Sequence, residues 1–346
     1  MPRQFDTIYF GGGTPALLAP ELFTAIFAAV RNQFQLDPDV EITVECAPGQ
    51  ISDGTLASLV EAGVNRVSLG VQSFVDREAA LSGRLHTRAQ VLEDLRRLRA
   101  AGIVNLNIDL LAGLAEQTLS SWRESLAVLL DTGAPHASVY MLEIDDDSRL
   151  GRELISGGAR YSAGLVPSDD SIAQMYEEAI DTFASAGLKQ YEISNFAAEE
   201  QASRHNLRYW QRRPYLGIGL DASSMFRSSE ERDIAILRTT TTDDLTAYLD
   251  GTETVAETAW LGTTQQLEEA WFLGLRCNAG VRIDHLREEF GPAAIQPGLD
   301  AARRLANDGL LTISGGCVTL TSRGRLISND VFAEFLGLGI GVEMSR

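Results

Sequence analysis

The sequence predicts an α/β protein, built as an open parallel sheet or a partial (β/α) barrel and followed by a small helical domain. In the first half of the 346 residues, short apolar runs alternate with amphipathic segments. This alternation is typical of repeated βα units. From about residue 240 the order changes to helices followed by a hairpin, which is typical of a winged-helix-like module. We therefore predict one domain over residues 1–235 and a second over 236–346.

Five apolar runs predict the first strands of the sheet, because each is too short to be a buried helix. They are residues 7–10, 41–46, 66–71, 104–110 and 137–142. Helices are expected at residues 20–34, 52–63, 87–101, 119–132 and 168–187. Gly63 and Gly102 supply stop signals for two of them. Two further strands, near 189–193 and 215–220, bring the predicted sheet to about six or seven strands.

The rest of the chain is predicted in less detail. The segment 145–167 is rich in Asp, Gly and Ser, so we expect it to pass over the mouth of the barrel. The C-terminal domain is predicted to contain helices near 243–249, 263–278, 282–289 and 297–308. Residues 310–314 and 317–320 flank Gly315-Gly316 and are expected to form a hairpin.

Composition excludes several classes of function. The net charge of -19 argues against nucleic acid as a partner, because a phosphate backbone needs a basic surface. No apolar run reaches the roughly 18 residues of a membrane span, and the first residues do not resemble a signal peptide. We expect a cytoplasmic protein with no integral membrane segment, and contact with a membrane surface stays open. Cys46, Cys277 and Cys317 lie far apart, so their spacing indicates neither disulfides nor a zinc or iron–sulfur motif.

Polar residues at the strand ends indicate a ligand site, because α/β proteins bind ligands at the carboxyl ends of their strands. In order along the chain they are Gly11-Gly12-Gly13-Thr14, Glu45, Gln72, Asp109 and Glu143, with Arg84 in a following loop. Each has an ordinary alternative: a tight glycine turn, a helix N-cap at Asp109, a surface arginine. Their recurrence on several strands favours a binding mouth for a small polar ligand.

A second candidate site is the basic, aromatic segment 204–213, which reads Arg-His-Asn-Leu-Arg-Tyr-Trp-Gln-Arg-Arg. Aromatic faces stack, arginines pair with carboxylates and histidine can bind iron, so the segment suits a planar anionic ligand. An exposed basic loop that balances acidic neighbours is an equal alternative on this segment alone.

These motifs together resemble radical S-adenosylmethionine (SAM) proteins of the oxygen-independent coproporphyrinogen III oxidase family, and especially its heme chaperone branch. The resemblance covers residues 5–345, nearly the whole chain. It rests on Gly11-Gly12-Gly13-Thr14-Pro15, on Tyr191-Glu192-Ile193-Ser194-Asn195-Phe196, on His205-Asn206-Leu207-Arg208-Tyr209-Trp210, on Leu216-Gly217-Ile218-Gly219 and on the C-terminal segment from Val318. It implies a partial (β/α) barrel of the radical SAM type that lacks its first strand.

The resemblance also implies the site residues. SAM would be held by Gly12, Gly13, Thr14, Glu45, Gln72, Arg84 and Asp109. Heme would be bound by His205, Asn206 and Tyr209, with His205 as a ligand to its iron and neighbouring arginines at the propionates. Heme or a porphyrin and heme-acceptor proteins are the implied partners. No catalytic residue is assigned.

The chain departs from the family pattern in four places. The CxxxCxxC loop, which supplies the thiolates of the family's [4Fe–4S] cluster, is absent from the sequence. The segments 112–115, 145–147 and 219–222 also differ from the family's motifs around the mouth.

Three hypotheses follow. The first is a heme-binding chaperone, seen as an N-terminally truncated chain, that delivers heme to acceptor proteins. The second is a radical SAM enzyme acting on a porphyrinogen, with its cluster-binding segment missing. The third is a degenerate relative with neither activity. We favour truncation as the reason for the missing cysteines, because Glu45, Gln72, Arg84 and Asp109 are all retained.

Overall fold

The computed structural model describes residues 4–143, 163–228, 235–251 and 254–338. The chain forms two compact units, and it passes from the first to the second between His205 and Asn206, inside helix α8 (Arg204–Trp210). The boundary predicted from the sequence, after residue 235, falls within the second unit. The predicted excursion at 145–167 and the departure at 145–147 lie largely or wholly outside the described residues.

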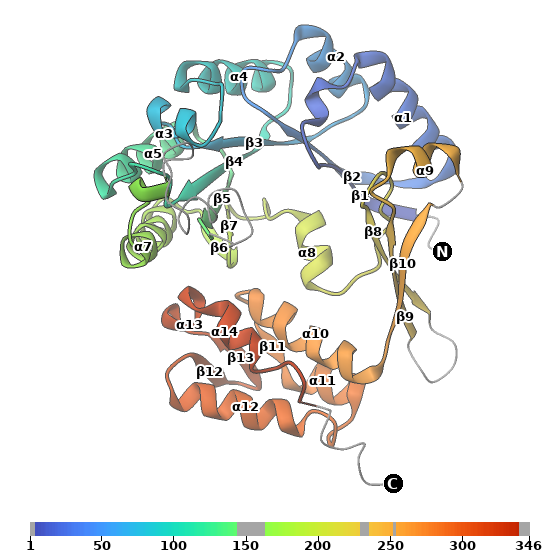
Figure 1. The fold of residues 1–346 in the computed structure, drawn as a ribbon, viewed down its shortest axis with the longest axis vertical. Helices are drawn as coiled ribbons and strands as arrows, with labels where there is room; N and C mark the ends of the chain where they lie inside the picture. Colours follow the sequence, from blue (N-terminus) through green and yellow to red (C-terminus); the bar gives the residue numbers. More distant parts are fainter. Residues whose placement is uncertain (1–3, 144–162, 229–234, 252–253, 339–346) are drawn as a thin grey trace. The chain divides into compact units, whose positions relative to one another are not determined.

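The first unit is built on a seven-stranded sheet in the order β1-β2-β3-β4-β5-β7-β6. The strands are β1 Gln4–Phe10, β2 Gln35–Cys46, β3 Arg66–Gln72, β4 Asn105–Ala112, β5 His136–Met141, β6 Lys189–Glu192 and β7 Asn195–Ala197. Strands β1 to β5 are parallel, and β7 runs antiparallel to both β5 and β6. The sheet curls into a half-barrel (Figure 1), which confirms the predicted fold class.

Helices cover the outer, convex face of this sheet (Figure 1). They are α1 Pro20–Gln33, α2 Asp53–Glu61, α3 Asp76–Leu81, α4 Arg88–Ala100, α5 Leu119–Thr132 and α7 Asp169–Ser185, with short 3₁₀ turns at η1 Pro15–Leu17 and η2 Ala163–Leu165. All except α3 match helices predicted from the sequence. Ser52, Thr87, Thr118 and Ser168 cap α2, α4, α5 and α7 with their hydroxyls, which satisfies backbone donors that a helix leaves unpaired.

The two faces of the sheet differ in chemistry. On β3, Val67, Leu69 and Val71 are fully buried and apolar, whereas Arg66 and Ser68 alternate with them and point to the opposite face. Strands β2, β4 and β5 show the same alternation, with polar residues on one face. A helix-covered parallel sheet usually carries apolar residues on both faces. The inner face here is instead polar, and it is this face that carries the candidate site.

One predicted strand is wrong. Residues 215–220 form no strand, and only Tyr215 makes an isolated bridge, to Met225. The backbone there cannot stay extended, since Gly219 has φ of 121° and Asp221 has φ of 51°. The sheet obtains its seventh strand from β7 instead, which was not predicted from the sequence.

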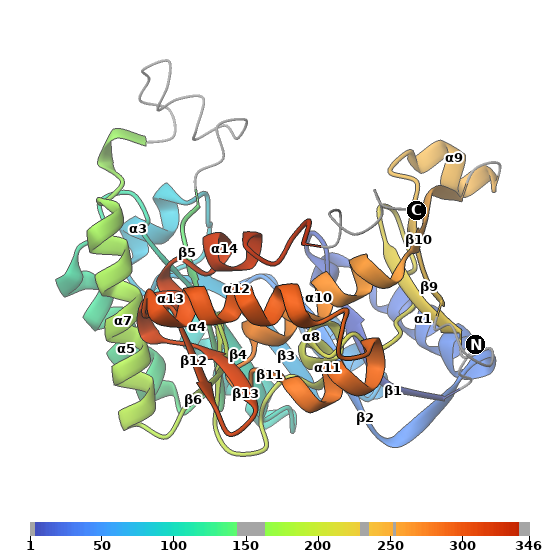
Figure 2. The same cartoon turned by 90° about the horizontal axis from the view of Figure 1, so that it is seen from below.

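The second unit contains two small antiparallel sheets. Strands β8 Ser223–Ser228, β9 Ala235–Thr241 and β10 Val255–Leu261 form one, with α9 Leu245–Asp250 between β9 and β10. The other has the order β11-β13-β12. It is accompanied by helices (Figure 2), and the elements are α10 Thr263–Arg276, β11 Val281–Arg282, α11 Ile283–Phe290, α12 Gln296–Asn307, β12 Leu311–Ser314, β13 Cys317–Leu320, α13 Ser322–Leu326 and α14 Ser328–Ala333. The predicted helices and hairpin are all present.

The core of the C-terminal part is centred on Trp271, whose ring stacks on Phe335 with centroids 4.9 Å apart. Gly298 of α12 lies against the same indole, and a Cβ at that position would be 2.4 Å from Trp271 Nε1. Only glycine therefore allows α12 to approach this closely.

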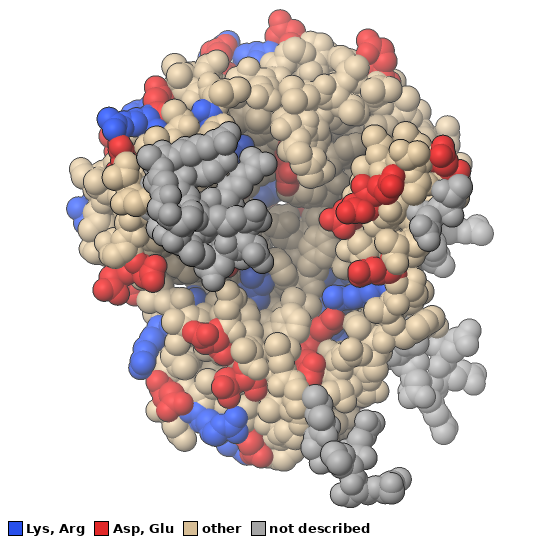
Figure 3. All heavy atoms as spheres, viewed as in Figure 1, with Lys and Arg blue, Asp and Glu red and all other residues tan. Residues whose placement is uncertain are grey.

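The surface charge and the helices agree with the acidic composition and with the lack of long apolar runs in the sequence. Figure 3 shows acidic side chains spread over the face in view, interspersed with fewer basic ones. Among the described residues, no helix is both long and apolar enough to cross a membrane.

Candidate ligand site on the inner face of the sheet

The glycine run lies directly after β1. Gly12 and Gly13 have φ of 80° and 73°, which side-chain-bearing residues rarely adopt. Gly11 is restricted by space instead, because a Cβ there would lie 2.7 Å from Tyr9 Cε1 and 3.1 Å from Glu45 Oε1. All three glycines are exposed, and Thr14 next to them is half-buried. The loop thus presents bare backbone beside a carboxylate.

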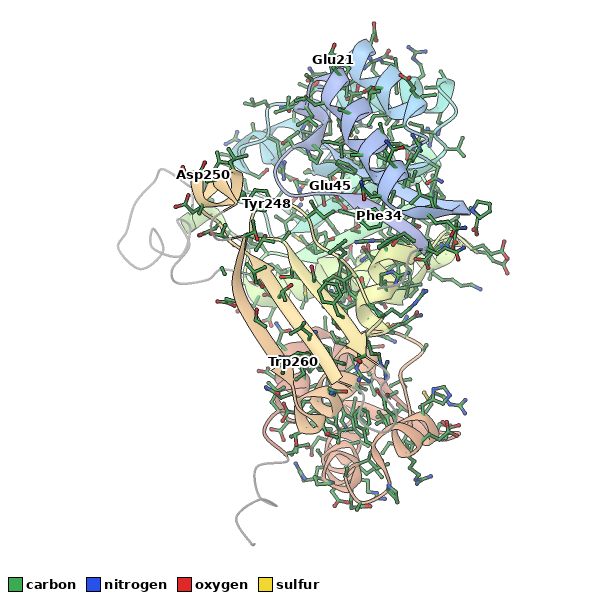
Figure 4. All side chains as sticks on the ribbon, turned by 90° about the vertical axis from the view of Figure 1, so that its right-hand side faces the viewer. Glu21, Phe34, Glu45, Tyr248, Asp250 and Trp260 are labelled. Carbon is green, nitrogen blue, oxygen red and sulfur yellow. The ribbon has the colours of Figure 1, made fainter. Side chains whose placement is uncertain are left out.

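That carboxylate belongs to Glu45, the penultimate residue of β2 (Figure 4). Its Oε1 accepts a hydrogen bond from the Tyr9 hydroxyl at 2.6 Å, and its Oε2 accepts from the Gly12 N–H at 3.3 Å. Burial raises the pKa of the Tyr9 hydroxyl, and the nearby Glu45 charge raises it further, so Tyr9 stays protonated as a donor. Glu45 is thereby fixed at the mouth.

A second carboxylate, Asp109, lies two strands away. Its Oδ2 accepts from Ser68 Oγ at 3.1 Å and its Oδ1 from Asn107 Nδ2 at 2.7 Å. Ser68 is also the residue that pairs with Glu45 in the β2–β3 register, so it stands between the two acids. Burial raises the pKa of Asp109, and the charge of Glu45 adds to the effect. Two neighbouring carboxylates on one face suit a cationic ligand.

Gln72 and Arg84 also come together, over Gly70 of β3. A Cβ on Gly70 would lie 3.6 Å from Gln72 Nε2 and 3.7 Å from Arg84 Nη1, so both side chains pass above that glycine. Gln72 has φ of 67°, in the left-handed region that favours glycine, and the β3–β4 register shifts at this point. Strained backbone of this kind is concentrated at functional sites.

This strain predicts that glycine is more stabilising than alanine at Gln72, the opposite of the order expected at an ordinary helical position. At Gln72, glycine should give a free energy of unfolding about 1 kcal/mol higher than alanine, since alanine must keep the left-handed conformation. At Leu92, an exposed position in α4, alanine should instead be better than glycine by about 1 kcal/mol. Urea denaturation of the four variants measures both differences. Equal rankings at the two positions would contradict the strain at Gln72.

His205 lies in the same unit, at the start of α8. Its Nδ1 is 3.0 Å from Thr7 Oγ1, and its ring stacks on Tyr9 with centroids 4.9 Å apart and an interplanar angle of 20°. Glu41 of β2 accepts from the backbone N–H of Arg204 at 3.0 Å and of His205 at 2.9 Å. An acidic side chain at a helix N-terminus stabilises that end. His205 therefore lies close to the mouth, with Tyr9 contacting both Glu45 and His205.

The remaining heme-site candidates follow His205 on α8. Tyr209 has its ring edge-on to Tyr215, with centroids 4.7 Å apart. Trp210 lies beneath the Arg276 guanidinium, which is 4.3 Å from the ring centroid. Asn206 is half-buried. In the second unit the aromatic side chains of this segment thus pack against other side chains of the protein.

Arginines of this segment also have acceptors within the protein. Arg204 contacts Asp39, Arg208 donates to the carbonyl of Pro214 at 2.8 Å, and Arg212 pairs with both oxygens of Glu289 at 3.2 and 3.0 Å. Arg213 is exposed. That neighbouring arginines meet the heme propionates stays a prediction.

Sequence reasoning missed a chain of buried polar groups that starts at Asp109. Asn107 Oδ1 can only accept, so His136 Nδ1, 2.6 Å away, must be the donor. Burial lowers the pKa of His136 well below its usual value, so the ring is neutral and its Nε2 accepts from the Tyr191 hydroxyl at 3.0 Å. That hydroxyl accepts from the N–H of Ser203, just before α8, at 3.3 Å. In each hydrogen bond of this chain, from Ser203 to Asp109, the acceptor is therefore the group nearer to Asp109 along the chain.

A signal for these residues was present in the sequence. Asn105, Asn107 and Asp109 recur with the strand period of two, as do His136 and Ser138. Reading the strands only as apolar runs concealed this second, polar face.

The buried neutral histidine predicts a pH dependence. In the unfolded chain His136 titrates near 6.5, while the folded protein keeps it unprotonated to much lower pH. Below pH about 6.5 the unfolded state therefore binds one more proton, and stability falls by about 1.4 kcal/mol for each pH unit. His136→Gln should lose this contribution. The measurement is urea denaturation of both proteins between pH 5 and 8, and parallel pH profiles would rule out the proposed protonation state.

Comparison with known proteins shows to which family the chain belongs. The Radical SAM superfamily model matches residues 2–129, and the HemN C-terminal domain model matches residues 261–327. Heme chaperone HemW of Lactococcus lactis is 33% identical over 336 residues, which cover 96% of this chain and 85% of the relative. Heme chaperone HemW of Bacillus subtilis is 34% identical over 342 residues, covering 96% and 86%. The chain belongs to the HemW family.

The HemW family fold is also seen in a solved structure. Coproporphyrinogen III oxidase (HemN) from Escherichia coli, a radical SAM enzyme, superposes with a TM-score of 0.79 at 20% identity, covering 96% of this chain and 78% of that one. At this identity the likeness concerns the fold alone. It supports the half-barrel and the C-terminal helical domain described above.

The radical SAM superfamily implies two cofactors, SAM and a [4Fe–4S] cluster. The cysteines do not fit the cluster. Cys46 is buried on β2, where desolvation raises the pKa of its thiol to about 12, and Cys277 and Cys317 belong to the other unit. Among the described residues no three His, Cys, Asp or Glu side chains gather to hold a metal ion.

The mouth does fit SAM. Gly11 leaves no room for a Cβ, Gly12 and Gly13 expose their backbone, and Glu45 and Asp109 offer two carboxylates to a cation. Gln72 and Arg84 add an amide and a guanidinium over Gly70. These groups match an amino acid with ammonium, carboxylate and sulfonium functions.

Proposed function

We propose that this protein is a heme-binding chaperone that delivers heme to acceptor proteins. The observation that carries the proposal is the setting of His205. Its imidazole is held on one edge by Thr7 and on one face by Tyr9, and its backbone N–H is held by Glu41. Relatives named heme chaperone HemW that span most of the chain support the same conclusion.

In this proposal His205 binds the heme iron through Nε2. A metal-bound histidine usually donates its other ring N–H to an oxygen, which fixes the tautomer, and Thr7 Oγ1 is placed to accept it from Nδ1. Tyr209 follows four residues later on α8, on the same helical face, and Asn206 is next to His205. The neighbouring arginines of segment 204–213 are assigned to the propionates.

We further propose that the mouth binds SAM through Gly12, Gly13, Thr14, Glu45, Gln72, Arg84 and Asp109. When bound, SAM would place its cationic groups against the two carboxylates. We assign no radical step to this chain, because its cysteines do not fit the cluster that would supply the electron.

Heme titration tests the proposal. The purified protein should bind heme with one-to-one stoichiometry and shift the Soret band of free heme. Mixing the complex with an apo-globin should then transfer the heme, and the globin spectrum reports the transfer. Absence of any Soret shift would refute heme binding. A stable complex that never releases heme to an acceptor would instead support storage over delivery.

A further inference from the structure

Tyr9 contacts both candidate ligand sites. Its hydroxyl donates to Glu45 Oε1 at 2.6 Å, and its ring stacks on His205 at 4.9 Å between centroids. The same side chain therefore fixes a carboxylate at the mouth and supports the imidazole at the start of α8.

The surroundings leave Tyr9 little freedom. In the β1–β2 register it pairs with Thr43, which lies between Glu41 and Glu45 on the inner face of β2. The backbone of Gly11 lies close to the edge of the Tyr9 ring, since a Cβ on Gly11 would be 2.7 Å from Tyr9 Cε1. Tyr9 thus cannot turn away from Glu45 without also disturbing its neighbours.

His205 depends on the same two strands. Thr7 precedes Tyr9 by two residues, so both side chains project to the same face of β1, where they meet the edge and the face of the imidazole. Glu41 of β2 holds the backbone N–H of His205 at 2.9 Å. A change in Tyr9 at the Glu45 end consequently reaches the imidazole through direct contact.

We propose that Tyr9 is a positioning residue that links ligand binding at Glu45 to heme binding at His205. A cation bound at Glu45 orders the carboxylate and, through the hydroxyl, the ring on which His205 stacks. Heme then meets an imidazole that is already ordered, and binds more tightly. Because linkage is reciprocal, heme must strengthen cation binding by the same factor. This inference rests on the proposed function, which supplies the two ligands.

The test measures heme affinity by Soret titration with and without SAM, in the wild type and in Tyr9→Phe. The phenyl ring keeps the stacking on His205 and removes only the bond to Glu45. SAM should tighten heme binding by about fivefold or more in the wild type. In Tyr9→Phe the two affinities should agree. Tyr248→Phe is the matched control, because Tyr248 on α9 (Figure 4) accepts from Gly219 N–H in the other unit and should leave the SAM effect unchanged.

A double-mutant cycle gives a readout that needs no SAM. Glu45→Gln should change heme affinity about threefold or more in the Tyr9 protein and leave it unaltered in Tyr9→Phe. The inference is overturned if heme affinity is indifferent to SAM and to Glu45→Gln, or if either effect persists in Tyr9→Phe. Failure to bind heme at all would instead refute the proposed function, so the two failures are distinguishable.

Discussion

Replacing His205 by alanine should weaken heme binding by at least about 100-fold and abolish the Soret shift at micromolar protein. Loss of a group that merely supports a metal ligand costs about 10- to 100-fold in affinity, so loss of the ligand itself should reach or exceed that range. Glu41 binds the backbone of this residue and not its side chain, so α8 should keep its start in the variant. Optical titration and the spin-state bands of the complex measure the effect.

Two further variants define the role of His205. Thr7→Val removes the oxygen at 3.0 Å from Nδ1 and should weaken heme binding by about tenfold, as expected of a supporting contact. His285→Ala removes an exposed imidazole from α11 and should leave heme affinity unchanged. Equal affinities of His205→Ala and His285→Ala would remove His205 from the heme site.

Replacing Asn107 by leucine should lower the free energy of unfolding by about 3 kcal/mol or more. Asn107 accepts from His136 Nδ1 at 2.6 Å and donates to Asp109 at 2.7 Å and to Ser68 at 2.7 Å. Leucine leaves these buried groups without their partner, and each unsatisfied group costs about 1–3 kcal/mol. Urea or thermal denaturation, followed by circular dichroism, measures the loss.

Asn32→Leu is a matched control, because Asn32 is exposed on α1 and its replacement should change stability by no more than about 0.5 kcal/mol. If Asn107→Leu were as stable as this control, the buried chain from Asp109 to α8 would not contribute to the fold. A fully stable Asn107→Leu would also argue that Asp109 does not need its Asn107 donor.

The sequence predicted the outer architecture well, since the outer face obeys simple rules. The apolar runs 66–71 and 104–110 each follow a helix that stops at a glycine, Gly63 and Gly102, and these helices and strands are present where expected. The same rules failed at 215–220. There the apolar residues Leu216 and Ile218 suggest a strand, but the backbone turns at Gly219 and Asp221, which both have positive φ.

The candidate site residues could be named one by one from the sequence, but their spatial arrangement could not. Glu45 and Asp109 were recognisable as acids ending strands, because parallel strands place their carboxyl ends at one edge. The adjacency of His205 to Glu45 could not be predicted, since 160 positions separate Glu45 from His205 in the sequence and the contact between them passes through Tyr9. Tyr9 was read only as part of an apolar run, and nothing local marks it as a link.

The placement of Glu41 and Glu45 on one face of β2 constrains how this protein can evolve. Glu41 anchors α8 and Glu45 faces the mouth, and they are four residues apart on one side of a single strand. A slip of that strand by one residue would turn both away together. An insertion in β2 would therefore disrupt both proposed binding sites at once, so the two sites should be retained or lost together in evolution.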